Sequence, residues 1–340
     1  MTHTVRSLLL TAAFGLALLP LAATAQPYLL AEGLQGTSGS TVGPDGALYV
    51  TEGLTGSISR VDPWTGEITP YATGLPLANQ LIPGSGLGGP VDVVFVDGVA
   101  YALVNLVGGC LGIPELPDNE GIYRMEGPDD FSLFADLGAW SRDNPPSFDF
   151  LIDLPCGVPY AMEPFRGGFL VTDGHHNRVL WVSPDGLISE FKGFGNVVPT
   201  GLEVHGKTVY LAQAGELPHE PEDGSKVISI NAQSLATTDV GSGAPLLVDV
   251  EIGLGRTLYA LAQGQWTGFF SPNPGSPADP LTGSLSRINA DGSFTEVAGG
   301  LNLPTSMQFI GNTAFIVNLA GEIWVIEDVS APPFGRGRKH

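Results

Sequence analysis

The sequence has 340 residues, with 47 glycines and 28 prolines, and only 14% of its residues are charged. Its formal net charge is −21, and a surface this acidic repels a phosphate backbone, which disfavours nucleic-acid binding. The acidic excess is compatible with neutral or cationic ligands, with metal ions, or simply with solubility.

The first 25 residues have the pattern of a cleaved signal peptide. Arg6 supplies a short positive region, residues 8–21 form an apolar run broken by Pro20, and small residues at 23–25 precede Gln26. The alternative is an uncleaved membrane anchor, but the run is short for a span. We therefore expect a secreted or periplasmic protein without membrane insertion.

From residue 26 to residue 330, one four-part unit recurs six times. An apolar strand leads through a tight polar turn to a second strand rich in Tyr, Leu and Val. A third strand of the type Ile-Ser-Arg-Val follows, and a fourth strand completes the unit. The first strands are expected at 41–42, 90–96, 159–164, 199–204, 247–252 and 304–309. Such a repeat is typical of a β-propeller, in which each unit forms one four-stranded blade.

The sixth unit stops after its third strand, at residue 327, and the missing strand lies at the other end of the repeat region. Residues 27–34 follow the fourth-strand pattern of residues 70–75. A ring must hide its two free sheet edges, and an N-terminal strand added to the last blade does so. The sequence therefore predicts an all-β, six-bladed β-propeller whose last blade is closed by the N-terminal strand.

The connections differ in length between the two faces of this ring. Loops between second and third strands, and loops between blades, open on one face, which we call the loop face. It carries long connections at 76–89, 106–120, 138–158, 215–225 and 264–283, whereas the turns on the opposite turn face are nearly all tight. Long loops on a rigid scaffold often carry function, so we place a site for a small molecule or a protein segment at the loop-face mouth of the channel. The alternative for any single loop is that it only covers the rim.

Each second strand ends in a polar residue whose side chain can offer an oxygen to a hard cation such as calcium: Glu52, Asn105, Asp173, Gln213, Gln263 and Asn318. Further polar residues of the first strands are expected to face the channel: Asp92, Asp249, Glu163, Glu203, Glu251 and Gln308. The alternative is a water-filled channel lined by solvated acids.

His175 and His176 directly follow Asp173, and a histidine beside a carboxylate can act as a general base. The alternative is a pair of loop histidines without a catalytic task. Four aromatic residues of the long loops either stack on a ligand or anchor their loops: Trp140, Trp266, Phe269 and Phe270.

Both cysteines map to the loop face. Cys110 lies in the long loop of the second blade and Cys156 lies just before the third blade. In an exported protein, a disulfide between these adjacent blades would join two long loops. The basic residues after position 333 indicate a disordered tail at 331–340, and we expect a monomer.

Several segments resemble the ScyD/ScyE family of exported propellers, within the wider NHL and gluconolactonase-like group. They are Gly-Pro-Asp-Gly-Ala-Leu-Tyr-Val-Thr-Glu at 43–52 and shorter matches at 55–61, 136–140, 171–174 and 199–201. The resemblance covers most of the chain after residue 26, and it implies a propeller fold and export without an established reaction.

The wider group includes calcium-dependent lactonases and streptogramin lyases. As the alternative to a binding propeller, the resemblance therefore implies a calcium-dependent hydrolase or lyase at the channel mouth. Its ligands would be Glu52, Asn105, Asp173 and Asn318, with His175 or His176 as the base. The sequence leaves open whether the protein is an enzyme, and calcium is the one cofactor implied.

Overall fold

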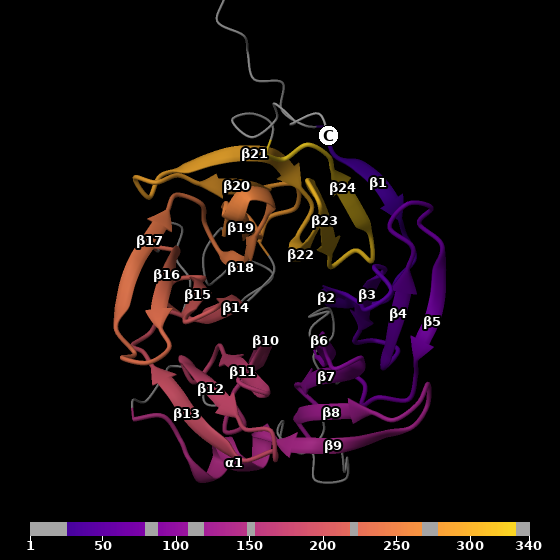
Figure 1. Cartoon of the computed structure of the whole chain (residues 1–340), viewed down its shortest axis with the longest axis vertical. Coiled ribbons are helices and arrows are strands. Elements are labelled where there is room, and N and C mark those ends of the chain that lie inside the picture. Colours follow the sequence, from indigo (N-terminus) through magenta and orange to yellow (C-terminus); the bar gives the residue numbers. More distant parts are fainter. Residues whose placement is uncertain are drawn as a thin grey trace, which may run out of the picture.

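The computed structural model describes residues 26–78, 88–107, 119–147, 154–217, 224–266 and 278–330. These residues form six four-stranded antiparallel sheets, arranged as blades around a central channel (Figure 1). The predicted six-bladed β-propeller is confirmed. The expected signal peptide at 1–25 and the expected tail at 331–340 lie outside the described residues.

The strands of each blade follow one another along the chain. Blade 1 holds β2 (Thr37–Val42), β3 (Leu48–Glu52), β4 (Ser57–Val61) and β5 (Ile68–Ala72). Blade 2 holds β6 (Gly89–Val96), β7 (Val99–Asn105), β8 (Gly121–Met125) and β9 (Phe131–Asp136). Blade 3 holds β10 (Pro159–Phe165), β11 (Gly168–Asp173), β12 (Arg178–Val182) and β13 (Ile188–Gly193).

The other three blades repeat this order. Blade 4 holds β14 (Pro199–His205), β15 (Thr208–Gln213), β16 (Lys226–Asn231) and β17 (Thr237–Ser242). Blade 5 holds β18 (Leu247–Ile252), β19 (Leu258–Ala262), β20 (Gly283–Ile288) and β21 (Phe294–Leu301), with a short 3-10 turn, η2 (Leu254–Arg256), before β19. Blade 6 holds β22 (Pro304–Ile310), β23 (Thr313–Asn318) and β24 (Ile323–Ile326), completed by β1 (Tyr28–Ala31).

The N-terminal strand closes the ring as predicted. β1 pairs antiparallel with β24, and Tyr28 lies opposite Val325. In Figure 1 the indigo β1 lies beside the yellow β24 at the outer rim. The last blade therefore has four hydrogen-bonded strands although the C-terminal part of the chain supplies only three of them.

The core lies between adjacent blades, because each sheet has a neighbouring sheet on either face. All five residues of β3 are buried, although a sheet with one wet face would bury only every second residue. Between blades 1 and 2, the Tyr49 ring packs edge-on against Phe95 and Tyr71, with centroids 4.7 and 4.8 Å apart. Such contacts fix the angle at which one blade meets the next.

The connection from blade 2 to blade 3 begins with α1 (Leu137–Asp143), the one α-helix in the described ranges. The prediction of an irregular connection from residue 138 was therefore wrong for its first part. Asp136 caps the helix, since its Oδ1 accepts the Ala139 N–H at 2.8 Å, and Leu137 is fully buried in the blade 2–3 core. No helix among the described residues is long and apolar enough to cross a membrane.

Candidate functional site

Every first strand begins on the loop face, and every second strand returns there. A buried polar residue stands at its end or, in blade 5, directly after it, where Gln263 follows β19. Glu52 binds the connection that enters blade 1 and the strand β4, and Asn318 fastens the turn between β23 and β24. Glu52 accepts hydrogen bonds from the Gln35 N–H (2.8 Å) and from the Ser59 hydroxyl (2.5 Å). Asn318 Oδ1 accepts the Glu322 N–H at 3.0 Å. The oxygens of both predicted ligands are thus engaged by protein donors.

Asn105 connects two blades. Its Nδ2 donates to the carbonyl oxygen of Pro159, the first residue of blade 3, at 2.5 Å. Its Oδ1 is buried and has no hydrogen-bond partner among the described residues. Of the four predicted calcium ligands, Asn105 is therefore the one that keeps an uncommitted oxygen.

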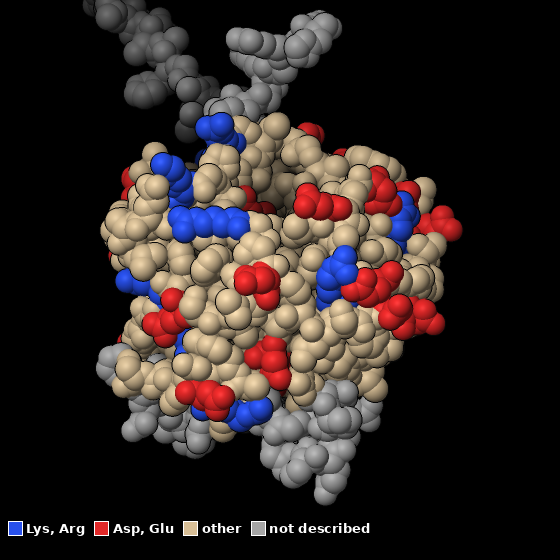
Figure 2. Space-filling model, turned by 60° about the horizontal axis from the view of Figure 1, so that its bottom comes forward, with Lys and Arg blue, Asp and Glu red and all other residues tan. Residues whose placement is uncertain are grey.

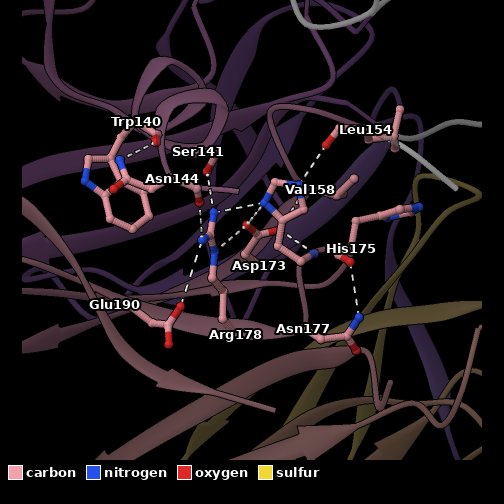
Figure 3. Close-up of polar contacts among 11 residues, drawn as sticks. Trp140, Ser141, Asn144, Leu154, Val158, Asp173, His175, Asn177, Arg178 and Glu190 are labelled. Carbon is pink, nitrogen blue, oxygen red and sulfur yellow. Dashed lines mark hydrogen bonds and ion pairs between the residues drawn. The ribbon is translucent and has the colours of Figure 1, made fainter. Parts of the chain in front are cut away.

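Asp173 lies at the centre of a polar network between blade 3 and α1 (Figure 3). Its carboxylate is fully buried and accepts the backbone N–H groups of Val158 (2.9 Å) and His176 (3.2 Å). The Arg178 guanidinium lies 3.3 Å from Oδ2, and the His176 ring lies 3.2 Å from the same oxygen. Burial alone would raise the pKa of Asp173, but the hydrogen bond and charge of His176 and the charge of Arg178 outweigh it and lower this pKa.

Arg178 joins this network to the helix. The guanidinium donates to the carbonyl oxygen of Asn144 (2.7 Å) and to the Ser141 hydroxyl (3.0 Å), and it lies over the Trp140 ring, 4.9 Å from the centroid. Its side chain is only 2% exposed, so the buried positive charge is matched by the buried carboxylate of Asp173. Trp140 therefore acts as an anchor of its connection, which is one of the two alternatives the sequence left open.

The two adjacent histidines have different surroundings. The His176 ring is held on both sides, because Nε2 lies 2.9 Å from the Leu154 carbonyl oxygen and Nδ1 lies 2.9 Å from the Arg178 guanidinium. His175 instead lines the cavity at the channel mouth. Asn177 fixes the turn between β11 and β12, which carries both histidines. Its Nδ2 donates to the His175 carbonyl oxygen at 3.1 Å, and its backbone is left-handed, with a φ of 52°.

The cavity at the loop-face mouth of the channel has a volume of about 130 Å³. Its wall is mostly apolar, with Val158, Val198, Leu246, Val248 and Trp266 among the lining residues. The polar side chains of the lining are Ser38, Tyr160, His175, Thr200, Gln263 and Thr305, and none of the described lining residues is Asp, Glu, Lys or Arg.

Tyr160 lies at the boundary between this cavity and the channel beneath it, with Ser38, Val248 and Thr305, which also line both spaces. The Tyr160 hydroxyl reaches across to the carbonyl oxygen of Thr305, 3.5 Å away. Burial, followed by the charges of Asp249 and Asp92, raises the pKa of Tyr160, so this hydroxyl stays protonated.

The channel below Tyr160 is narrow, with a volume of about 30 Å³, and residues of all six inner strands line it. Asp92 and Asp249 occupy equivalent places three blades apart. One oxygen of each accepts the N–H of the next residue, and the other accepts an N–H of the following blade, from Met162 (2.7 Å) or Met307 (2.8 Å). Burial raises the pKa of Asp92 to about 8 and that of Asp249 to about 7, although these hydrogen bonds act in the opposite direction. Both aspartates therefore link the inner strands of adjacent blades by hydrogen bonds.

Glu163, Glu203 and Glu251 form a cluster nearer the turn face, with one oxygen of each within 4.8 Å of the others. Gln308 donates to Glu251 at 3.0 Å. The channel wall encloses the three carboxylates, although part of each side chain is exposed along the channel, and burial is the main cause that raises the pKa of all three. Figure 2 shows acidic side chains within and around a hollow of the surface. The expectation that these residues face the channel is confirmed for the five that line it: Asp92, Glu163, Asp249, Glu251 and Gln308.

The four residues predicted to hold calcium do not, as arranged, offer a set of open oxygen ligands. The oxygens of Glu52, Asp173 and Asn318 are engaged by N–H or O–H donors, and Asp173 is also neutralised by Arg178. Calcium takes six to eight oxygens, and only Asn105 has a free one in this set. Calcium binding by these four residues stays a prediction, and it would require several of these contacts to be exchanged.

Other predicted site residues fall partly outside the described ranges. Cys156 is buried and is not a free thiol, whereas Cys110 lies outside the described residues, so a bridge between them stays a prediction. Phe269 and Phe270 also lie outside the described residues. The sequence reading did not single out the apolar wall of the cavity. A large apolar residue directly before the inner strand, as at Val198, is the signal that could have pointed to it.

Comparisons with known proteins support the fold and leave the activity open. No protein-family model matches the chain, and no curated protein sequence matches it. The structure is similar to that of a gluconolactonase from Xanthomonas campestris, with a TM-score of 0.60, 11% identity and 90% of each chain covered. It is also similar to a PQQ-bound aldose sugar dehydrogenase from Streptomyces coelicolor, with a TM-score of 0.58, 14% identity, and 89% of this chain and 98% of the other covered.

A virginiamycin B lyase from Staphylococcus aureus is similar as well, with a TM-score of 0.51, 15% identity, and 89% of this chain and 98% of the other covered. At such low identity the likeness shows the fold alone, which is that of the gluconolactonase-like propeller group. The narrower resemblance to ScyD/ScyE proteins stays a prediction. Fold and site together define a six-bladed propeller with an apolar cavity above a closed acidic channel.

Proposed function

We propose that this protein is an exported ligand-binding propeller, which holds a small molecule in the cavity at the loop-face mouth of the channel. The observation that carries the proposal is the cavity itself, about 130 Å³ in volume, apolar on its wall and bounded by Tyr160 on the side of the channel. Small-molecule sites are typically concave and apolar, with a few fixed polar groups. A small molecule fits this enclosed shape better than a protein segment does.

The surroundings of the cavity support a preformed site. His175 belongs to a turn that Asp173, His176 and Asn177 hold by hydrogen bonds, so its position is set before any ligand arrives. Preorganisation of this kind lowers the entropy lost on binding. Binding in this cavity does not require the predicted calcium ligands, which the alternative function as a hydrolase or lyase needs.

Methyl-labelled NMR spectra of the mature chain test the proposal. When a panel of neutral, anionic and cationic fragments is added, we expect shifts of the Val158, Val198, Leu246 and Val248 methyls. The methyls of Val61, which is buried in blade 1 away from the cavity lining, serve as the internal control and should not move. If no fragment shifts the cavity methyls, the proposed binding function is wrong.

The second candidate is a calcium-dependent hydrolase or lyase with His175 as the base. Two observations favour it: His175 lines the cavity, and Asn105 Oδ1 lacks a partner among the described residues. Calorimetric titration with calcium separates the two functions. Tight calcium binding that Asn105→Ala abolishes would support the enzyme. The absence of binding heat would show that the protein does not bind the calcium that this function requires. Asp173→Ala is a less clear probe, because it also leaves the Arg178 charge buried without a partner.

A further inference from the structure

The residue before each inner strand has an unusual backbone in most blades. In blades 1 and 2 it is a glycine, Gly36 or Gly88, with a φ of 65° or 111°. In blades 4, 5 and 6 it is Val198, Leu246 or Leu303, with φ angles of 45°, 49° and 48°. Left-handed backbone is unfavourable for residues with a Cβ, and a β-branched valine in it is a genuine outlier.

The backbone at this position has a clear task, which glycine performs equally well. The carbonyl oxygen accepts an N–H from the end of the second strand of the same blade. The bond lengths are 2.9 Å from Gly53 to Gly36, 2.9 Å from Ala214 to Val198, and 2.8 Å from Gln263 to Leu246. Because Gly36 makes this bond without strain, the task does not explain a large side chain at Val198 or Leu246.

What these side chains touch differs between blades. Val198 and Leu246 line the cavity, together with Val158, Val248 and Trp266. Leu303 has the same backbone conformation and packs against the same apolar cluster, but it is not a lining residue. The strained conformation therefore places two apolar side chains where a bound molecule would meet them, and Leu303 is a natural control for the strain alone.

The charges around the cavity indicate which class of ligand it can bind. Among the described residues, the cavity lining holds no arginine or lysine that could pair with an anion. The carboxylates around it are all held by protein donors: Asp92 and Asp249 lie towards the channel and accept backbone N–H groups, and Asp173 accepts the Val158 N–H and pairs with Arg178. A charged group would meet no Asp, Glu, Lys or Arg side chain among the described lining residues, and desolvation without such a counter-charge is costly. The rings of Tyr160 and Trp266 offer flat apolar surface instead.

We propose that Val198 and Leu246 determine the specificity of this cavity, and that they select an uncharged ligand with an apolar ring. The inference rests on the proposed binding function and adds the chemical class of the ligand. Glycine could accept the same backbone hydrogen bond, so the side chains at Val198 and Leu246 are retained for the apolar surface that they form around the cavity.

Two small probes that share one aromatic ring test the ligand class, because a cavity of about 130 Å³ has room for a single ring. Benzyl alcohol is neutral, and benzoate carries the same ring with a carboxylate. In titrations of the mature chain followed by the methyl signals of Leu246 and Val248, we expect the neutral probe to bind at least about tenfold more tightly. Equal affinities, or tighter binding of benzoate, would overturn the inference.

Substitutions test whether the side chain of Val198 contributes to ligand binding. Val198→Gly should weaken binding of the neutral probe by roughly fivefold or more, and Leu303→Gly by less than about twofold. Equal losses in both variants would show that the cavity wall does not select the ligand. Val198→Thr keeps the shape of the side chain and replaces one methyl group by a hydroxyl, so it should also weaken binding of the neutral probe. This variant serves as the test if Val198→Gly does not fold.

The failure of this inference can be told apart from that of the proposed function. If neither probe binds while charged fragments still shift the Val248 methyl in the NMR experiment, the binding function stands and the apolar ligand class is wrong. If no compound shifts that methyl, the cavity is not a binding site and both proposals fall.

Discussion

The three glutamates of the channel lead to a prediction about pH-dependent stability. Glu163, Glu203 and Glu251 each place an oxygen within 4.8 Å of the others, and no Lys, Arg or His is among the described residues that line the channel. Within the described ranges, no hydrogen bond to Glu163 favours its ionised form. Burial raises its pKa, and so do the charges of Glu203, Asp92 and Asp249. We therefore expect Glu163→Gln to stabilise the protein when the cluster is ionised.

The magnitude follows from the spacing. Two unit charges 4.8 Å apart repel each other by about 3.5 kcal/mol at an effective dielectric constant of about 20. Burial, and then Glu203, raises the pKa of Glu163 above its ordinary value of 4.5, so the folded state holds protons that the unfolded state has released. The stability that the cluster contributes is complete below pH 4.5 and is lost as the pH rises through the raised pKa of each group.

Glutamine in place of Glu163 resembles the protonated acid and cannot ionise. We expect the free energy of unfolding of Glu163→Gln to differ little from that of the parent at pH 5, and to exceed it by about 1–3 kcal/mol at pH 8.5. Urea denaturation in the presence of EDTA at both pH values measures the difference.

Glu67→Gln is the matched control, because Glu67 is exposed on the rim of blade 1 and its substitution should change little at either pH. A loss of stability in Glu163→Gln at pH 8.5 would refute the reasoning. It would mean that a positive charge compensates the cluster, as a bound cation would.

Three further expectations concern contacts that hold the site and the ring. Arg178→Ala should lower the free energy of unfolding by about 3–5 kcal/mol in urea denaturation, because it leaves a buried carboxylate without its cation, whereas Arg60→Ala, in an exposed ion pair, should cost less than about 1 kcal/mol. His176→Ala should cost about 1–3 kcal/mol, and more than His175→Ala, because its ring contacts both a carbonyl oxygen and the Arg178 guanidinium; equal losses would contradict this assignment. Deletion of residues 26–31 should lower the melting temperature and promote association, seen by calorimetry and light scattering, because β24 would become an open edge; an unchanged, monomeric protein would contradict ring closure by β1.

Blade number, strand positions and ring closure were readable from the sequence because they depend on local signals. Tight turns such as Asp97–Gly98 and apolar strand openings at Pro159 and Pro199 mark each blade separately, and the strand missing at one end matches the surplus strand at the other. The division into a loop face and a turn face follows from strand order and connection length alone. The sequence did not indicate the helix α1, because seven residues are too few for a clear periodic pattern. Burial of Leu137 and the Asp136 cap stabilise this helix instead.

The partners of the polar residues could not be predicted in the same way. Position and residue type selected Glu52, Asn105, Asp173 and Asn318 correctly as the loop-face ends of second strands. Whether their oxygens are open to a ligand depends on groups that other segments bring to them, such as the Val158 N–H for Asp173. The same holds for the two adjacent histidines, which the sequence could not rank.

The sequence by itself determined a ring of six blades closed by its first strand, because strand pairing between chain neighbours and the need to cover sheet edges leave one consistent arrangement. Tertiary structure alone decided which side chains meet at the centre. The cavity wall draws Val158, Val198 and Leu246 from the entrances of three different blades, and the glutamate cluster draws one residue from each of the same three. Their closeness follows from the angle between packed sheets, which depends on core contacts spread over the whole ring.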